Sequence, residues 1–153
     1  MRRLIRKFRT IALLSHSEKR QAASAILLMS CVRIVLWTVP FRVLKRMAET
    51  SRFSLSCFPA FSEERIVWAV RLACRYVPKA SCLTQALTAQ ILLNRAELEN
   101  RLHIGVFLGN GSAAAGYFES HAWIECQGRV LVGGAENTAR YATILTLESE
   151  RKP

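Results

Sequence analysis

The feature that most constrains the fold is a two-residue turn between two apolar segments near the C-terminal end. Residues 115–126 and 129–132 read as strands, and Gln127-Gly128 lies between them. Glycine adopts positive φ at little cost, so this dipeptide is typical of a β-hairpin turn. Residues 102–108 form another apolar run that ends at the turn-rich segment 109–112. We therefore expect a small antiparallel sheet of three strands.

The segment before these strands predicts a helix that begins at a cysteine. Pro78 ends the preceding helix, because proline has no N–H group to donate. Ser81 is a favourable N-cap, which places Cys82 at the first helical position. Free N–H groups and the helix dipole at that position stabilise a thiolate, and later an oxyanion. Three less apolar residues predict that the front of this helix lines a cleft: Thr84, Gln85 and Thr88. Of these, Gln85 is either an additional oxyanion donor or a solvated helix residue.

A histidine on the first strand of the hairpin is the natural partner of this cysteine. His121, Trp123 and Glu125 share one face of the strand, since strand side chains alternate. An imidazole beside a thiol is the pairing used in nucleophilic cysteine catalysis. The alternatives are an inert buried cysteine with an unrelated strand histidine, and a Trp123 that packs on the sheet rather than walling the cleft. The two local contexts favour catalysis by Cys82 and His121.

The motifs between residues 62 and 134 resemble a known family. They are Cys82-Leu83-x-Gln85-Ala86-Leu87, Leu92-Leu93-x-Arg95, Leu102-x-Ile104-Gly105-Val106 and His121-Ala122-Trp123-Ile124-Glu125. In order and spacing they resemble the transglutaminase-like leader peptidases of lasso-peptide biosynthesis, in the split form without a fused recognition domain. Pro40-Phe41-Arg42 resembles the N-terminal helical segment of that family.

This resemblance implies an α+β fold with a papain-like or transglutaminase-like core, in which the nucleophile helix packs on a small antiparallel sheet behind an N-terminal helical segment. It implies a cysteine protease that cleaves the leader from a ribosomally made precursor peptide. The implied partners are that precursor, a small leader-recognition protein and an ATP-dependent macrolactam cyclase. A transglutaminase-type acyl transferase and a catalytically weak basic scaffold are the alternatives.

The family pattern includes an aspartate on the strand after the histidine strand, and this chain contains no aspartate at all. Gly133 stands where the acid is expected. A regular two-residue hairpin would pair His121 with Gly134, and neither glycine has a side chain that can orient an imidazole. Our candidate for the third catalytic residue is Glu136. The alternatives are Asn137, a backbone carbonyl or a water molecule.

Composition limits the remaining possibilities. A chain of 153 residues is one domain, with a basic N-terminal helical segment at 1–50 and a catalytic core at 62–147. The five cysteines are odd in number and widely spaced, which favours a reducing cytoplasm over a disulfide framework. We expect no cofactor and no metal, and we expect the four cysteines other than Cys82 to be buried. Those four are Cys31, Cys57, Cys74 and Cys126.

The net charge of +11 is concentrated at the N-terminal end, where residues 1–50 hold eleven Lys and Arg against two Glu. No nucleic-acid-binding motif accompanies it, so we expect no nucleic acid as a partner. Residues 22–40 are apolar apart from Arg33 and approach the length of a membrane span. An arginine there costs about 2.5–3.5 kcal/mol on insertion scales. A soluble helix packed on the catalytic core is favoured, with interfacial membrane attachment and a true span as alternatives.

The remaining segments of the chain are predicted to be mainly helical. We expect helices at 2–14, from Ser15 or Ser17 to Thr38, at 41–48 and at 63–76 with Ser62 as the cap. Residues 138–147 have the pattern of an additional strand, and residues 148–153 that of a frayed end.

Overall fold

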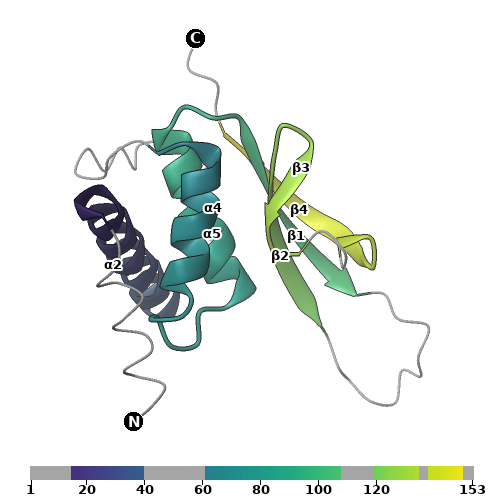
Figure 1. The fold of residues 1–153 in the computed structure, drawn as a ribbon. Helices are drawn as coiled ribbons and strands as arrows, with labels where there is room; N and C mark the ends of the chain where they lie inside the picture. The colour runs from purple at the N-terminus through teal and green to yellow at the C-terminus, as the bar shows by residue number, and fades with distance from the viewer. Residues whose placement is uncertain (1–14, 40–60, 108–118, 135–137, 150–153) are drawn as a thin grey trace.

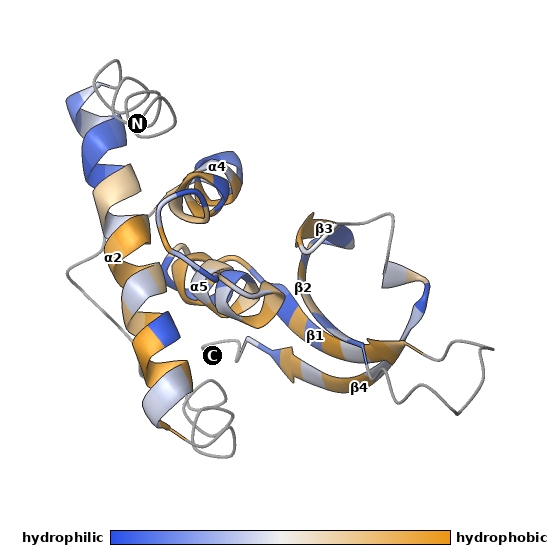
Figure 2. Ribbon diagram, turned by 90° about the horizontal axis from the view of Figure 1, so that it is seen from below, coloured by the Kyte–Doolittle hydropathy of each residue, from blue (hydrophilic) through white to orange (hydrophobic). Residues whose placement is uncertain are grey.

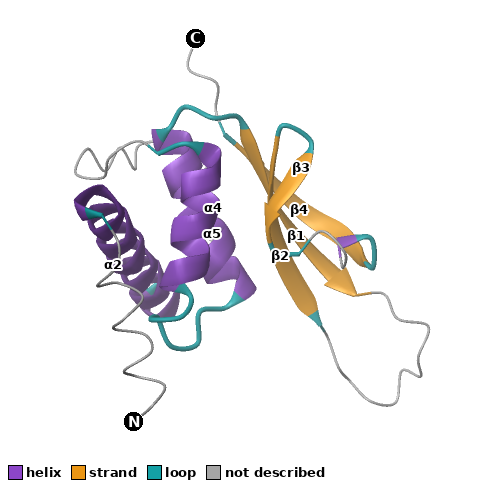
Figure 3. Ribbon diagram, in the orientation of Figure 1, coloured by secondary structure: helices purple, strands orange, loops and turns teal. Residues whose placement is uncertain are grey.

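The computed structural model describes residues 15–39, 61–107, 119–134 and 138–149. The predicted helices at 2–14 and 41–48 lie outside these residues. The described elements are α2 (His16–Thr38), α4 (Glu63–Ala73), α5 (Cys82–Arg95), β1 (Asn100–Phe107), β2 (Ser120–Cys126), β3 (Arg129–Val132) and β4 (Tyr141–Glu148). The helices come first along the chain and lie together on one side, with the strands on the other (Figures 1 and 3). The predicted α+β fold, with an N-terminal helix ahead of the core, is confirmed.

Helix α2 forms the outer layer and packs on α4 and α5. It begins after Ser15, whose side chain accepts a hydrogen bond from the Glu18 N–H while the Glu18 carboxylate accepts one from the Ser15 N–H. This reciprocal capping box decides between the two predicted starting serines in favour of Ser15. Glu18 also joins this layer to α4, because its carboxylate accepts a hydrogen bond from Arg65 of α4 at 3.0 Å.

Helix α2 is apolar on more than its packed face, as its colouring in Figure 2 shows. Ala25 and Met29 are buried in the common core, whereas Leu27, Ile34 and Trp37 are exposed. By length and composition alone, the helix is long and apolar enough to cross a membrane.

Helix α4 ends at Ala73, three residues before the predicted Tyr76. Residues 74–76 form turns instead, and Val77 closes the segment with a hydrogen bond from its N–H to the Ala73 carbonyl at 2.9 Å. The chain then turns through Pro78 into α5, which packs on β2, β1 and β3.

The sheet has four strands in the order β3-β2-β1-β4, and every neighbouring pair is antiparallel. The predicted additional strand therefore exists as β4, and it pairs with β1 rather than extending the hairpin. The turn at Gln127-Gly128 is confirmed, with φ values of 49° and 75°. The face toward the helices is apolar, because Leu102, Ile124 and Leu147 belong to one buried cluster with residues of α5.

The register of the hairpin differs from the expected one. Glu125 pairs with Val130, but Ile124 pairs with Val132, so Leu131 is an extra residue in a β-bulge. The predicted pairing of His121 with Gly134 is wrong for this reason. A bulge adds one residue to one strand only, and a count from the turn cannot anticipate it.

The expected cleft along the front of α5 is also wrong at two positions. Thr84 and Thr88 are fully buried. The Thr88 hydroxyl donates to the Thr84 carbonyl at 2.7 Å, which satisfies the hydroxyl within the helix and lets it pack in the core.

Candidate active site

Cys82 is the first residue of α5, as predicted. The N-cap is Ser81, whose Oγ accepts a hydrogen bond from the Thr84 N–H at 3.2 Å. Helix geometry leaves the N–H groups of Cys82 and Leu83 without intrahelical acceptors. The half-buried thiol therefore lies beside two backbone donors at the positive end of a helix.

Gln85 holds the loop that leads into this helix. Its side-chain Nε2 donates to the carbonyl of Ala80 at 3.1 Å, two residues before Cys82. This hydrogen bond ties the half-buried side chain to the backbone just before the cysteine.

His121 lies near the start of β2, directly opposite Gly105 of β1. Its Nε2 forms a 2.6 Å hydrogen bond with the carbonyl oxygen of Gly133. A carbonyl only accepts, so Nε2 carries the proton and, in the neutral ring, Nδ1 is left with a lone pair. The backbone of residue 133 thus supplies the acceptor that a side chain at this position lacks.

An aromatic row runs across this face of the sheet. The His121 ring lies 5.0 Å from that of Tyr141 and 6.2 Å from that of Trp123. His103 lies at the far end of the row, where its ring stacks on that of Trp123 with the centroids 5.3 Å apart. Trp123 is 6% exposed and flanks the histidine, and this burial fits the predicted sheet-packing role.

Tyr141 is the site residue that sequence reasoning missed. Its hydroxyl donates to Oε1 of Glu119 at 2.6 Å. That hydrogen bond, followed by burial, raises the pKa of Tyr141, and Cys82 contributes to the same increase. Helix α5, which begins with Cys82, packs on β2, which carries His121. The only signal in the sequence was an aromatic residue at the start of an additional strand.

The other carboxylates near the sheet are engaged elsewhere. Glu63 forms an ion pair with Arg129, and Glu125 lies 3.5 Å from Nε2 of His103 rather than near His121. Glu136 and Asn137, the predicted third member and its alternative, lie outside the described residues. Among the residues that are described, the acceptor for His121 is the Gly133 carbonyl.

The remaining cysteines differ in exposure. Cys126 is buried and Cys74 is half-buried, and burial raises the pKa of both thiols, which keeps them protonated and unreactive near neutral pH. Cys31 is exposed, so the expectation that all four are buried is wrong for this residue. Its position on the outer face of α2 was not readable from an apolar helix pattern, and Cys57 lies outside the described residues. No cluster of metal-ligating side chains is present in the described part of the chain.

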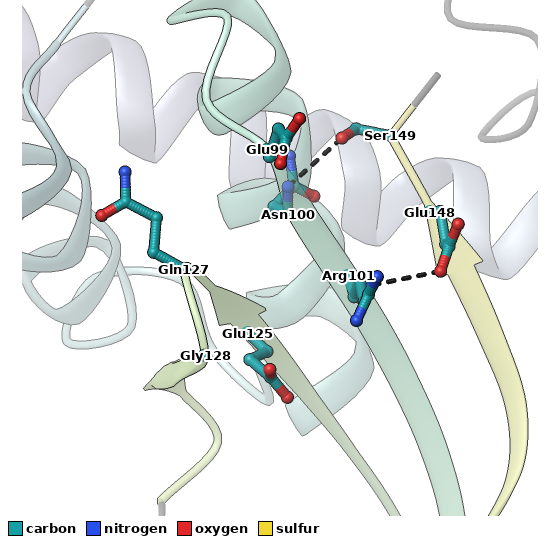
Figure 4. A pocket seen from close by; sticks show the side chains of 8 residues that line it. All are labelled: Glu99, Asn100, Arg101, Glu125, Gln127, Gly128, Glu148 and Ser149. Carbon is teal, nitrogen blue, oxygen red and sulfur yellow. Dashed lines mark hydrogen bonds and ion pairs between the residues drawn. The ribbon is translucent and has the colours of Figure 1, made fainter. Parts of the chain in front are cut away.

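A cavity of about 490 Å³ lies at the opposite end of the sheet, where β1 begins and β2 ends (Figure 4). Its lining is mostly charged and amide side chains, and two of these, Arg101 and Glu148, form an ion pair at 3.1 Å between neighbouring strands. Neither Cys82 nor His121 lines it, so it is separate from the candidate catalytic residues.

Comparison with known proteins places these features in a family. A family model described as the transglutaminase-like superfamily matches residues 25–146, from within α2 to within β4. No curated protein and no solved structure gives a significant match. The matched region contains Cys82, His121, the strands β1 to β3 and most of β4. Because this match covers most of the chain, the protein belongs to the transglutaminase-like superfamily.

Proposed function

We propose that this chain is the peptidase that removes the leader from a ribosomally made lasso-peptide precursor before the macrolactam closes. Membership of the superfamily supports a cysteine peptidase or an acyl transferase. The observation that carries the narrower assignment is the run of motifs around Cys82 and His121, in the order and spacing of split leader peptidases.

In the proposed reaction, His121 takes the thiol proton and the Cys82 sulfur attacks the carbonyl at the leader–core junction. The N–H groups of Cys82 and Leu83 bind the oxyanion that forms. His121 then protonates the leaving amine, which becomes the free N-terminus of the core peptide. Water attacks the remaining thioester, gives a proton to His121 and releases the leader as a carboxylic acid.

The absence of aspartate does not leave the imidazole without an acceptor. Nε2 of His121 is bound at 2.6 Å to the Gly133 carbonyl, which supports a neutral tautomer with Nδ1 available as the base. Glu136 stays in the proposal as the alternative third member. It would have to compete with this carbonyl for the same nitrogen.

The partners belong to the same proposal. In the proposal, a separate small protein captures the leader and presents the precursor, as the resemblance to the split form of the family implies. The new N-terminus must then be joined to a side-chain carboxyl group by an ATP-dependent cyclase. A cytoplasmic location is proposed with these partners, because five cysteines, odd in number and widely spaced, fit a reducing compartment.

The decisive experiment combines the purified full-length chain, a precursor peptide and a leader-recognition protein, and weighs the products. The proposal expects two fragments whose masses sum to that of the precursor plus one water. Ammonia loss or crosslinking would identify a transferase, and an unchanged precursor would identify a scaffold. Cys82→Ala serves as the matched control for contaminating proteases.

A further inference from the structure

Tyr141 is two strands away from His121 in the sheet, yet the two rings are neighbours. Tyr141 begins β4 and pairs with Phe107 of β1, while His121 pairs with Gly105 on the other side of β1. The ring centroids of Tyr141 and His121 lie 5.0 Å apart with an interplanar angle of 31°. The contact therefore reaches across the end of β1.

Gly105 makes this contact possible. A Cβ atom at Gly105 would lie 2.9 Å from the Tyr141 Cβ and 3.0 Å from Cζ3 of Trp123. Those separations are shorter than van der Waals contact. A side chain at 105 would push apart the two aromatic residues that flank His121, so the glycine serves close approach rather than a turn.

Tyr141 is also tethered at its other end. Its hydroxyl donates to Glu119 at 2.6 Å, and the Glu119 carbonyl accepts a hydrogen bond from the Phe107 N–H at 2.9 Å. The second bond extends the β1–β2 ladder by one residue and fixes the backbone of Glu119. The ring is thus held by the strand that carries it and by the residue just before the strand that carries His121.

We infer that Tyr141, anchored by Glu119, is a positioning residue for His121 that supplies part of what the missing aspartate supplies elsewhere in the family. For its effect on turnover the inference rests on the proposed function. The contacts that support it do not depend on which substrate is cleaved.

Two physical needs support this role. A single hydrogen bond to the Gly133 carbonyl leaves the imidazole free to rotate about the bond axis, and a ring against its face restricts that rotation. A neutral carbonyl also stabilises an imidazolium less than a carboxylate does. Aromatic faces within about 6 Å of a cation attract it, and Tyr141 meets that condition.

His121 has neighbours on three elements of the sheet. Trp123 flanks it from β2, the Gly133 carbonyl follows β3, and Tyr141 flanks it from β4. The charged groups that act on Tyr141 are Glu119 and Arg140, and the thiol of Cys82 acts on it from α5. Changes at Tyr141 are expected to alter the imidazole without removing any of its hydrogen bonds.

The test uses the full chain with Cys31→Ser as background, because Cys31 is exposed. Tyr141→Leu removes the aromatic face, Tyr141→Phe removes only the tether, and Ile144→Ala is a control at an exposed site on the same strand. Two readouts need no substrate: the rate at which iodoacetamide alkylates Cys82 near neutral pH, and the His121 tautomer from its ¹⁵N NMR shifts. Thermal unfolding reports whether each variant is folded.

We expect Tyr141→Leu to slow alkylation about tenfold and to give a mixed tautomer population, and Tyr141→Phe to have a smaller effect in the same direction. Loss of cleavage should reach about 100-fold, the scale of a misplaced catalytic group. Glu119→Gln, which keeps an acceptor, should recover part of what Glu119→Ala loses. The Ile144→Ala control should match the background.

A folded Tyr141→Leu protein with unchanged alkylation rate and a single tautomer would overturn the inference. If that variant does not fold, Tyr141→Phe and Glu119→Ala decide in its place, since both keep most of the packing. Wild-type alkylation and tautomer in both would overturn the inference equally. A chain that shows these shifts but leaves every precursor intact would refute the peptidase and keep the positioning role.

Discussion

Gly133 is the residue where the local backbone decides the chemistry. Its φ is +108°, in the region that favours glycine. A Cβ atom there would lie 2.5 Å from the Cβ of Trp123 and 2.9 Å from the Ala122 carbonyl. The backbone therefore has to approach β2 closely at this point, and that approach brings the Gly133 carbonyl to His121.

We predict that Gly133→Ala lowers stability by roughly 1–3 kcal/mol, from the positive φ and the clash with Trp123. The matched control is Gly134→Ala, because Gly134 also has positive φ but nothing lies within 4 Å of its added Cβ. Urea unfolding of both variants measures the difference. Equal losses at the two positions would mean that the close approach to Trp123 does not matter.

The same geometry bears on restoring the family's acid. Gly133→Asp is expected to disturb folding rather than to improve catalysis, because any side chain at 133 meets Trp123. Glu136→Gln is expected to be nearly silent in a kcat measurement, since Nε2 of His121 already has an acceptor. A strong loss of turnover with unchanged stability would instead establish Glu136 as the third catalytic residue.

Cys82 and His121 are expected to be indispensable, and His103 replaceable. Cys82→Ala should abolish cleavage without unfolding the protein. His121→Ala should lower kcat by orders of magnitude while binding of the leader is retained. His103 bonds to Thr146 at 3.0 Å and stacks on Trp123, so His103→Ala is expected to cost stability more than rate. Kinetics in which His103→Ala is dead and His121→Ala active would reverse these roles.

At the scale of elements, one carboxylate, that of Glu18, adds a polar contact to the apolar packing of α2 on α4. The hydrogen bond from the Ser15 backbone, and then the one from Arg65, hold the pKa of Glu18 below its ordinary value. A lowered pKa in the folded state means that this stabilisation is present above the ordinary carboxyl pKa. It is lost as the pH falls through the lowered value.

We therefore predict that Glu18→Gln lowers the melting temperature at neutral pH, and that the difference from wild type disappears at acid pH. Circular dichroism melting curves at both conditions measure this. Glu97→Gln, at an exposed turn after α5, is the control for losing a negative charge from a basic protein. A Glu18→Gln deficit that persists unchanged at acid pH would contradict the assignment.

At the scale of the whole molecule, the net charge of +11 and the exposed apolar face of α2 both favour contact with an anionic membrane surface. One face of α2 packs on α4 and α5, which favours a helix docked on the protein over one surrounded by lipid. The opposite face exposes Leu27, Ile34 and Trp37, and the Arg33 guanidinium lies 5.5 Å from the Trp37 ring. Exposed apolar residues with basic neighbours suit the surface of an anionic bilayer.

We expect the chain to co-sediment with anionic vesicles, more weakly as salt is added, and not with zwitterionic vesicles. Replacing Leu27, Ile34 and Trp37 with serine should abolish the binding. Ile144→Ser, which removes an exposed apolar residue from β4, should not. Equal binding by both variants would exclude this face as the contact.

The sequence by itself determined the elements that depend on local chemistry. The capped start of α5 at Cys82, the Gln127-Gly128 turn and the antiparallel sheet follow from N-cap preference, positive φ and alternation, which act over a few residues. Only the tertiary structure decided how His121 is held. The bulge at Leu131 shifted the hairpin register, the close approach of Gly133 to Trp123 turned a carbonyl toward the imidazole, and β4 brought Tyr141 across the end of β1. These contacts join residues that are distant along the chain, and packing between strands, not any local preference, creates them.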